Sequence, residues 1–200
     1  LLCNTTANAN TAVGHKALCL TTTGIDNVAV GQNTLRANTT GASNTGLGKS
    51  ALKANTTGAN NTAVGSNSLD ANTTGLNNTT VGFDSLTSNT TGASNVAMGN
   101  QAMFDNTTGN NNVGVGCDAL ANNTTASNNT AVGCGALHKN TTGSTNTATG
   151  QRASACNTTG SNNTAFGHHA LCATTTANDN TAVGFRAMET NTTGNTNSAI

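Results

Sequence analysis

Large side chains and charges are nearly missing from this sequence. It contains no proline, tryptophan or tyrosine, and aromatic residues make up 2% and charged residues 7% of its 200 residues. An average globular chain carries about 25% charged residues and a core of large apolar side chains. The composition therefore excludes a globular domain built around a thick core.

The charge balance excludes two further classes of protein. Seven basic and seven acidic residues give a formal net charge of zero, and the basic residues are scattered, whereas nucleic-acid binding rests on clustered lysine and arginine. No apolar run approaches the roughly 20 residues that span a bilayer. We expect no nucleic-acid partner and no membrane insertion.

What the chain does contain is mostly asparagine, threonine, alanine and glycine in a strict repeat. Polar chains of low complexity can be disordered, but disordered chains often carry net charge and lack apolar residues at a fixed phase. This chain carries no net charge and has apolar residues at a fixed phase, so we expect it to be ordered. A glycine recurs every 17 residues without insertion, at Gly14, Gly31, Gly48, Gly65, Gly82, Gly99, Gly116, Gly133, Gly150, Gly167 and Gly184.

The consensus of the repeat is N-T-A-V-G-x-x-A-L-x-x-N-T-T-G-x-x. An apolar residue precedes the first glycine and a threonine or valine stands two positions earlier, so the two share one face of a short strand. Because threonine exchanges with valine at Val28, Val96 and Val113, we predict that this face points inward. The alanine or glycine between them would then form a flat outer face.

A second apolar column follows the glycine by four positions, as at Leu35 and Leu52, and predicts a second short strand. Units of α-solenoids are longer, about 33 residues or more, and this composition has poor helix propensity. We therefore predict an all-β fold, a parallel β-solenoid (β-roll) of about twelve 17-residue rungs with two short strands each.

Fixed polar residues mark the corners. An asparagine occurs at the same position of each repeat, from Asn27 to Asn197, and stacked asparagines can form a hydrogen-bonded ladder along the axis. The glycine of N-T-T-G marks a second corner.

The thin core predicts association with other copies. Two large apolar side chains in each rung offset little of the conformational entropy lost on ordering, and the flat alanine face offers a packing surface. Neither end carries an atypical capping repeat. We expect residues 1–200 to be a single uncapped repeat domain, a segment or stacking unit of a longer fibre.

The six cysteines fall into three pairs in matching registers: Cys3 with Cys19, Cys117 with Cys134, and Cys156 with Cys172. Stacked rungs would bring each pair within disulfide range, which predicts three staples and an oxidising, extracellular setting. Free thiols or a metal site are the alternatives, although the spacings are not those of a zinc site.

No residue set points to an enzyme. His168 and His169 would point to opposite faces if they lie on consecutive strand positions, the acids lie in variable columns, and serine, histidine and aspartate do not recur together. We predict no catalytic, cofactor-binding or metal-binding residue. The N-x-T sequons, such as Asn38-Thr39-Thr40, are either glycosylation acceptors or corner residues.

The first threonine of N-T-T forms a candidate surface ladder of hydroxyls and methyls, with rungs spaced by about 4.8 Å. Its members are Thr22, Thr39, Thr56, Thr73, Thr90, Thr107, Thr124, Thr141, Thr158, Thr175 and Thr192. Flat, uncharged threonine arrays resemble the ice-binding surfaces of β-solenoid antifreeze proteins.

The unit Asn61-Thr62-Ala63-Val64-Gly65, repeated at Asn129-Thr130-Ala131-Val132-Gly133, resembles the N-S-V-A-I-G repeat of trimeric autotransporter adhesin heads. It is also similar to N-T-A-V-G arrays of tail-fibre-like surface proteins. The resemblance spans the chain and implies a left-handed β-roll that is often trimeric and extends an adhesive surface. It implies no catalytic or ligand-binding residue.

Two functions follow as expectations. The first is a non-enzymatic structural or adhesive fibre protein, extracellular or on the cell surface, which forms a homo-oligomer as a trimer or an end-to-end filament. The second is an ice-binding protein that uses a threonine face, with ice as its partner surface.

Overall fold

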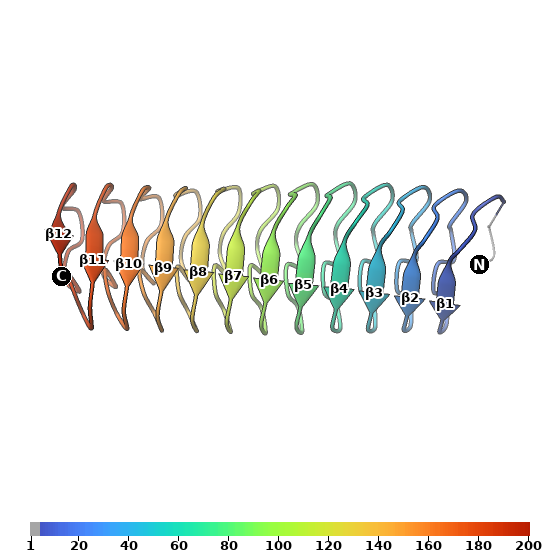
Figure 1. Cartoon of the computed structure of the whole chain (residues 1–200), viewed down its shortest axis with the longest axis horizontal. Helices are drawn as coiled ribbons and strands as arrows, with labels where there is room; N and C mark the ends of the chain where they lie inside the picture. Colours follow the sequence, from blue (N-terminus) through green and yellow to red (C-terminus); the bar gives the residue numbers. More distant parts are fainter. Residues whose placement is uncertain (1–4) are drawn as a thin grey trace.

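The computed structural model describes residues 5–200 and confirms the parallel β-solenoid. Twelve short strands stack in sequence order into one sheet, and the chain returns behind the sheet in every rung (Figure 1). No helix occurs in residues 5–200. The strands are β1 (Thr11–Val13), β2 (Val28–Val30), β3 (Thr45–Leu47), β4 (Thr62–Val64), β5 (Thr79–Val81), β6 (Val96–Met98), β7 (Val113–Val115), β8 (Thr130–Val132), β9 (Thr147–Thr149), β10 (Thr164–Phe166), β11 (Thr181–Val183) and β12 (Ser198–Ala199).

Neighbouring strands pair in the register of the repeat. Thr62 of β4 stands opposite Thr79 of β5, and Val64 opposite Val81. Like residues therefore form columns that run straight along the axis of the rod.

A glycine directly follows each of the strands β1 to β11. Gly14 has a φ of 124°, and a Cβ atom there would lie 2.6 Å from the carbonyl oxygen of Gly31 in the next rung. No side chain fits so close to backbone. The glycine column therefore fixes a sharp corner and the close stacking of rungs.

The second predicted strand is replaced by turns. Leu35 and Leu52 have φ values of 50° and 53°, in the left-handed region, so this segment is not extended. Its amides still bond to the next rung, with Leu35 N–H donating to the Ala51 carbonyl and Ala37 N–H to the Lys53 carbonyl, both at 3.0 Å. The left-handed conformation costs a leucine about 1–2 kcal/mol, which burial of its side chain offsets with about 2–3 kcal/mol.

The two faces of each strand are the reverse of the prediction. Ala97 and Ala131 are fully buried, whereas Val81 and Val132 are 41% and 38% exposed. The threonine and apolar columns face outward, and the alanine column faces the interior. The flat face that was expected to pack against other copies is therefore inside the coil.

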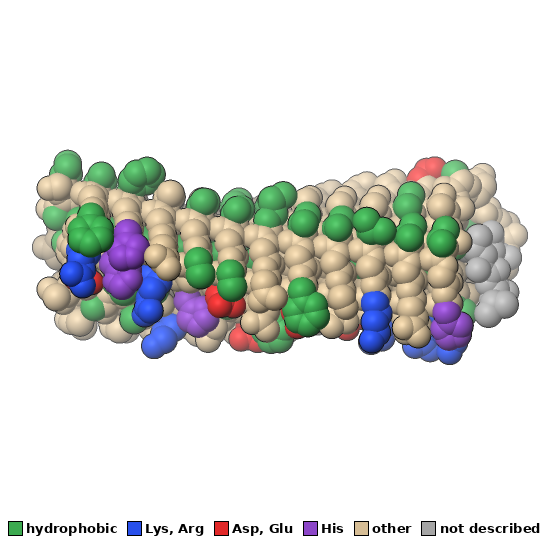
Figure 2. All heavy atoms as spheres, turned by 90° about the horizontal axis from the view of Figure 1, so that it is seen from below, with side chains coloured by type: hydrophobic (Ala, Val, Ile, Leu, Met, Phe, Trp, Pro, Cys, Tyr) green, Lys and Arg blue, Asp and Glu red, His purple; other side chains and the backbone are tan. Residues whose placement is uncertain are grey.

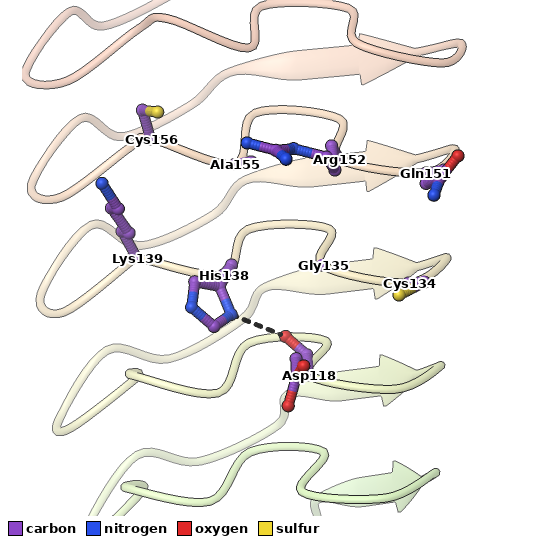
Figure 3. Close-up of a pocket in the computed structure, with 9 residues that line it drawn as sticks. All are labelled: Asp118, Cys134, Gly135, His138, Lys139, Gln151, Arg152, Ala155 and Cys156. Atoms are coloured by element: carbon purple, nitrogen blue, oxygen red, sulfur yellow. Dashed lines mark hydrogen bonds between the residues drawn. The ribbon is translucent and has the colours of Figure 1, made fainter.

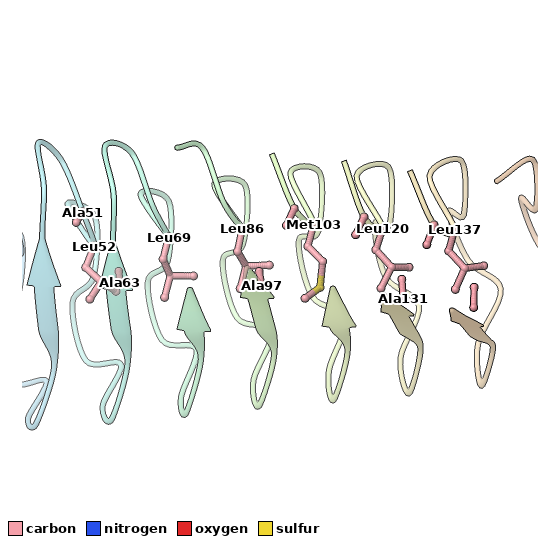
Figure 4. Close-up of a cluster of buried hydrophobic side chains, with 14 of the residues drawn as sticks. Ala51, Leu52, Ala63, Leu69, Leu86, Ala97, Met103, Leu120, Ala131 and Leu137 are labelled. Carbon is pink, nitrogen blue, oxygen red and sulfur yellow. The ribbon is translucent and has the colours of Figure 1, made fainter. Parts of the chain in front are cut away.

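The narrow interior explains this reversal. The leucine column points at the strands from the opposite side of the coil and fills the interior in a single row (Figure 4). Where the opposing residue is larger, the strand residue shrinks: a Cβ at Gly46 would lie 2.5 Å from Thr34 Cγ2, and one at Gly114 would lie 3.2 Å from Met103 Cγ. A valine column could not fit there.

Two asparagine ladders line the interior beside this core. In the first, which the sequence predicts, Asn78 donates its backbone N–H and its Nδ2 to Asn61 Oδ1 at 2.9 and 3.2 Å, and Nδ2 also to the Gly92 carbonyl at 2.9 Å. The fully buried members of this ladder are Asn27, Asn44, Asn61, Asn78, Asn95, Asn112, Asn129 and Asn180, with Asn146 and Asn163 at 1% exposure.

The second ladder was not predicted and is formed by the asparagine of N-T-T. Asn72 Nδ2 donates to Asn55 Oδ1 at 2.8 Å and to the Gly75 carbonyl at 3.1 Å. The ladder is interrupted where Thr174 replaces asparagine, and Asn157 Oδ1 is left without a hydrogen-bond partner. These ladders supply interior hydrogen bonds where the core is too thin for more apolar side chains.

Candidate functional site

The most continuous exposed feature of the rod is the outward side of the sheet, which we call the strand face. It consists of two columns that run the length of the rod, one of threonine or valine and one of apolar residues. The first column is Thr11, Val28, Thr45, Thr62, Thr79, Val96, Val113, Thr130, Thr147, Thr164, Thr181 and Ser198; the second is Val13, Val30, Leu47, Val64, Val81, Met98, Val115, Val132, Thr149, Phe166, Val183 and Ile200.

The strand face is apolar, exposed and uncharged. Val13 and Phe166 are each 57% exposed and Leu47 is 47% exposed. Neither column contains a lysine, arginine, aspartate or glutamate. Figure 2 shows hydrophobic side chains along the upper part of the rod, with most of the charged side chains lying below that row.

Geometry makes the strand face regular in two directions. Adjacent strands lie about 4.8 Å apart, and outward residues two apart on a strand lie about 6.6 Å apart. Because the register is uniform, the surface repeats in every rung. A partner with the same period would make the same contact along the whole rod.

The outward direction of this face differs from the prediction, although the sequence contains a signal for it. The middle position of the strand is alanine or glycine in every rung except at Thr80. An outward position has no reason to stay so small, whereas a crowded inward one does. Thr80 is accommodated because its hydroxyl lies 2.6 Å from that of Ser68, another polar residue in a column that is mostly alanine.

The candidate surface ladder of threonines has a different role from the predicted one. Its members are half-buried for most of the rod. Their hydroxyls donate to the backbone carbonyl of the equivalent threonine in the next rung, as Thr56 Oγ1 does to the Thr73 carbonyl at 3.0 Å. These hydroxyls bond the rungs together. The second threonine of N-T-T, for example Thr74 or Thr91, is the exposed one.

Burial also bears on the sequons. Asn38 is fully buried and donates to the Gly41 carbonyl at 2.9 Å. An asparagine in this position of the folded rod is inaccessible, which favours the interpretation of N-T-T-G as a structural corner.

The described cysteines are thiols. Cys19, Cys117, Cys134, Cys156 and Cys172 are free, so the predicted Cys117–Cys134 and Cys156–Cys172 disulfides are not present, and Cys3 lies outside the described residues. Cys117 nevertheless lies beside Cys134: desolvation, followed by the neighbouring Asp118 and Cys134 side chains, raises the pKa of Cys117. Disulfide formation under oxidising conditions stays a prediction.

The paired histidines lie side by side and do not point to opposite faces. The rings of His168 and His169 stack with centroids 4.3 Å apart, and His168 also stacks on Phe185 at 5.4 Å. The prediction failed because these residues follow the strand-ending glycine and lie in a turn. Within residues 5–200, no group of three histidine, cysteine or acidic residues is placed to hold a metal ion.

The described part of the chain also contains no helix that is both long and apolar enough to cross a membrane. Comparison of the chain with protein-family models, with curated proteins and with solved structures gave no match.

Proposed function

We propose that this chain is a non-enzymatic structural fibre segment whose copies associate side by side through the strand face. The observation that carries the proposal is the continuous, uncharged apolar column of the strand face. Large exposed apolar surfaces on soluble proteins commonly mark interaction sites.

A second copy is the partner that suits this surface best. The strand face has a period set by the spacing of strands, and a rod of the same chain has the same period. Two such faces pack as two β-sheets do, with uncharged side chains interdigitating. No charge in either column would be left buried and unpaired.

The energetics favour association that depends on length. Burying the exposed half of a valine contributes about 1 kcal/mol. Eleven full strands on each of two rods therefore contribute about 20 kcal/mol, against a cost of about 4–15 kcal/mol for association. The contribution grows with the number of rungs, so longer rods would associate more tightly.

The likeness to trimeric autotransporter adhesin heads supports the same proposal. It suggests an extracellular or cell-surface setting, an adhesive role and a trimer, in which the strand faces of three copies would meet around one axis in place of two faces packing as a pair. On this proposal the threonine corners and turns form the outer surface of the fibre.

Sedimentation velocity tests the proposal. The unmodified protein should sediment as an oligomer, and the double variant Val81→Glu/Val132→Glu should sediment as a monomer because each glutamate would be buried in the interface. The matched control Thr91→Glu/Thr142→Glu places the same charges on exposed corners and should leave the oligomer intact. Unmodified protein that remains monomeric at high concentration would contradict the proposal.

Ice binding is a second candidate, favoured by the outward threonines on a flat sheet. Threonines of the strand face form one column at the spacing of the strands, with valine in three rungs, and the apolar column beside it is also uncharged. If this face binds ice, the unmodified protein will show thermal hysteresis, Thr62→Lys/Thr79→Lys will lose it, and the corner variant Thr74→Lys/Thr91→Lys will keep it. Absence of hysteresis in the unmodified protein would reject this function.

A further inference from the structure

A hollow of about 460 Å³ opens among the turns that follow β7, β8 and β9. It lies away from the strand face and is lined by side chains from successive rungs, including Asp118, Cys134, His138, Lys139, Arg152 and Cys156 (Figure 3).

The hollow exists because two columns are locally short of side chain. Gly135 occupies the column that holds Asp118 one rung before and Arg152 one rung after. A Cβ atom at Gly135 would meet only Arg152 Cγ, at 3.6 Å, within the contact range. Ala155 is also small, where the preceding rung has His138.

Basic groups dominate the lining. Lys139 is directed toward the rung of Cys156, and the Arg152 side chain reaches back toward Ala155 (Figure 3). Both are exposed, and in residues 5–200 neither forms an ion pair with a carboxylate. Burial raises the pKa of Cys172, the thiol that Arg152 approaches, so that thiol does not neutralise the guanidinium.

The one acid of the lining is engaged elsewhere. Asp118 Oδ2 accepts a hydrogen bond from the Cys117 thiol at 3.4 Å. His138 Nδ1 lies 3.4 Å from the backbone carbonyl oxygen of Asp118, not from its carboxylate, and the carboxylate points away from His138 in Figure 3. Two cations thus face the hollow with no carboxylate between them.

Nearby rungs show what would complete this arrangement. In the same two columns, His169 Nδ1 lies 3.3 Å from Glu189 Oε1 and Arg186 Nε lies 2.9 Å from Glu189 Oε2. Glu189 thus supplies a carboxylate to the basic groups of its neighbourhood. In the hollow, Arg152 occupies the column of Arg186, but Ala155 occupies the column of Glu189, so the equivalent carboxylate is missing.

We propose that this hollow binds a small polar molecule through an oxyanion group, a phosphate or a carboxylate, which takes the place that Glu189 fills near the end of the rod. Lys139 and Arg152 donate charge-assisted hydrogen bonds to the oxyanion. The volume exceeds that of a lone anion and lies in the range of small-molecule sites, so it also accommodates a sugar-sized remainder. The exposed cations make the binding weak, in the millimolar range.

Ligand-observed NMR with the whole chain tests the proposal, because it tolerates weak binding and large assemblies. Phosphorus line widths report inorganic phosphate and glucose 6-phosphate, and saturation transfer reports glucuronate and glucose. We expect saturable binding of at least one anion and none of glucose. Tighter binding of glucose 6-phosphate than of free phosphate assigns the rest of the hollow to the sugar.

Four variants in the hollow and one control outside it tie the binding to this place. Lys139→Gln and Arg152→Gln each weaken it by about tenfold, whereas Lys49→Gln, outside the hollow, changes nothing. Gly135→Asp abolishes binding because it supplies an internal carboxylate, and Gly135→Asn, which has the same shape without charge, retains part of it. Aspartate and asparagine both occur in this left-handed column, at Asp118 and Asn67.

Absence of saturable binding by every anion, or glucose binding as tightly as glucose 6-phosphate, would overturn the proposal. Equal losses in the Lys49→Gln and Lys139→Gln variants would do the same. Lys139 and Arg152 are exposed, so their variants keep the test decisive even if a Gly135 variant does not fold. None of these results depends on self-association through the strand face.

Discussion

Replacing Asn78 by alanine tests whether the ladders hold the rod together. Asn78 makes four side-chain hydrogen bonds. Nδ2 donates to Asn61 Oδ1 and the Gly92 carbonyl, and Oδ1 accepts from the backbone N–H and the Nδ2 of Asn95. Asn78→Ala removes all four at a position that is fully buried.

The expected loss of folding free energy depends on which of the former partners of Asn78 keep another hydrogen bond. Asn95 Nδ2 retains the Gly109 carbonyl, the Gly92 carbonyl retains Asn89 Nδ2, and Asn61 Oδ1 retains the backbone N–H of residue 78. The backbone N–H of Asn95 alone becomes an unpaired buried donor, which costs about 1–3 kcal/mol. With the net loss of the other bonds, we expect destabilisation by about 3 kcal/mol.

Urea unfolding followed by circular dichroism measures this loss. The control is Asn100→Ala, an exposed asparagine in the same part of the rod, which should change the free energy of unfolding by less than about 0.5 kcal/mol. Because a solenoid can lose rungs locally, hydrogen exchange of the amides around the substituted rung should rise as well. Equal stability of the two variants would refute the view that the ladder stabilises the interior.

Three further outcomes can be measured. Thr174→Asn should raise the free energy of unfolding by about 1 kcal/mol in urea, because it continues the second ladder and gives Asn157 Oδ1 its missing donor; an unchanged value would count against that geometry. Desolvation by burial, opposed by Lys53, raises the pKa of Asp70. The folded protein therefore binds this proton more tightly than the unfolded chain does, and its stability falls as the pH rises from the usual aspartate pKa through the raised value. Asp70→Asn should remove that step from the pH dependence of urea unfolding, and an identical pH profile would contradict it. Air oxidation should link Cys117 to Cys134 within one chain, seen by mass spectrometry of a digest as their two peptides joined with the loss of two hydrogens, whereas links of these cysteines only between chains would show that the two thiols are not neighbours.

The repeat made the architecture predictable, but it left the direction of the side chains open. A 17-residue period with glycine at fixed phase specifies in-register rungs because any insertion would break the columns. Side chains alternate in direction along the strand Thr62-Ala63-Val64, so the sequence indicates which residues share a face. It does not indicate which of the two faces lies inside the coil. That choice depends on the width of the coil, which the leucine column of the returning segment sets.

The other differences between prediction and structure have local causes. The left-handed φ of Leu52 goes against the preference of leucine, so sequence patterns favoured a strand where tertiary packing imposes a turn. The second ladder went unrecognised because Asn72 precedes two threonines and resembled a surface corner. The basic hollow has no motif, since it arises from missing side chains at Gly135 and Ala155 and from charges in successive rungs.

The uniform stacking of rungs has a consequence for how such chains change over time. Removing or duplicating one complete repeat would reconnect every column to an equivalent neighbour, because residues 17 apart occupy the same place in adjacent rungs. Unequal recombination between repeats would then yield shorter or longer rods that still fold. The length of the rod is accordingly the property that selection can adjust most freely, without redesigning a single contact.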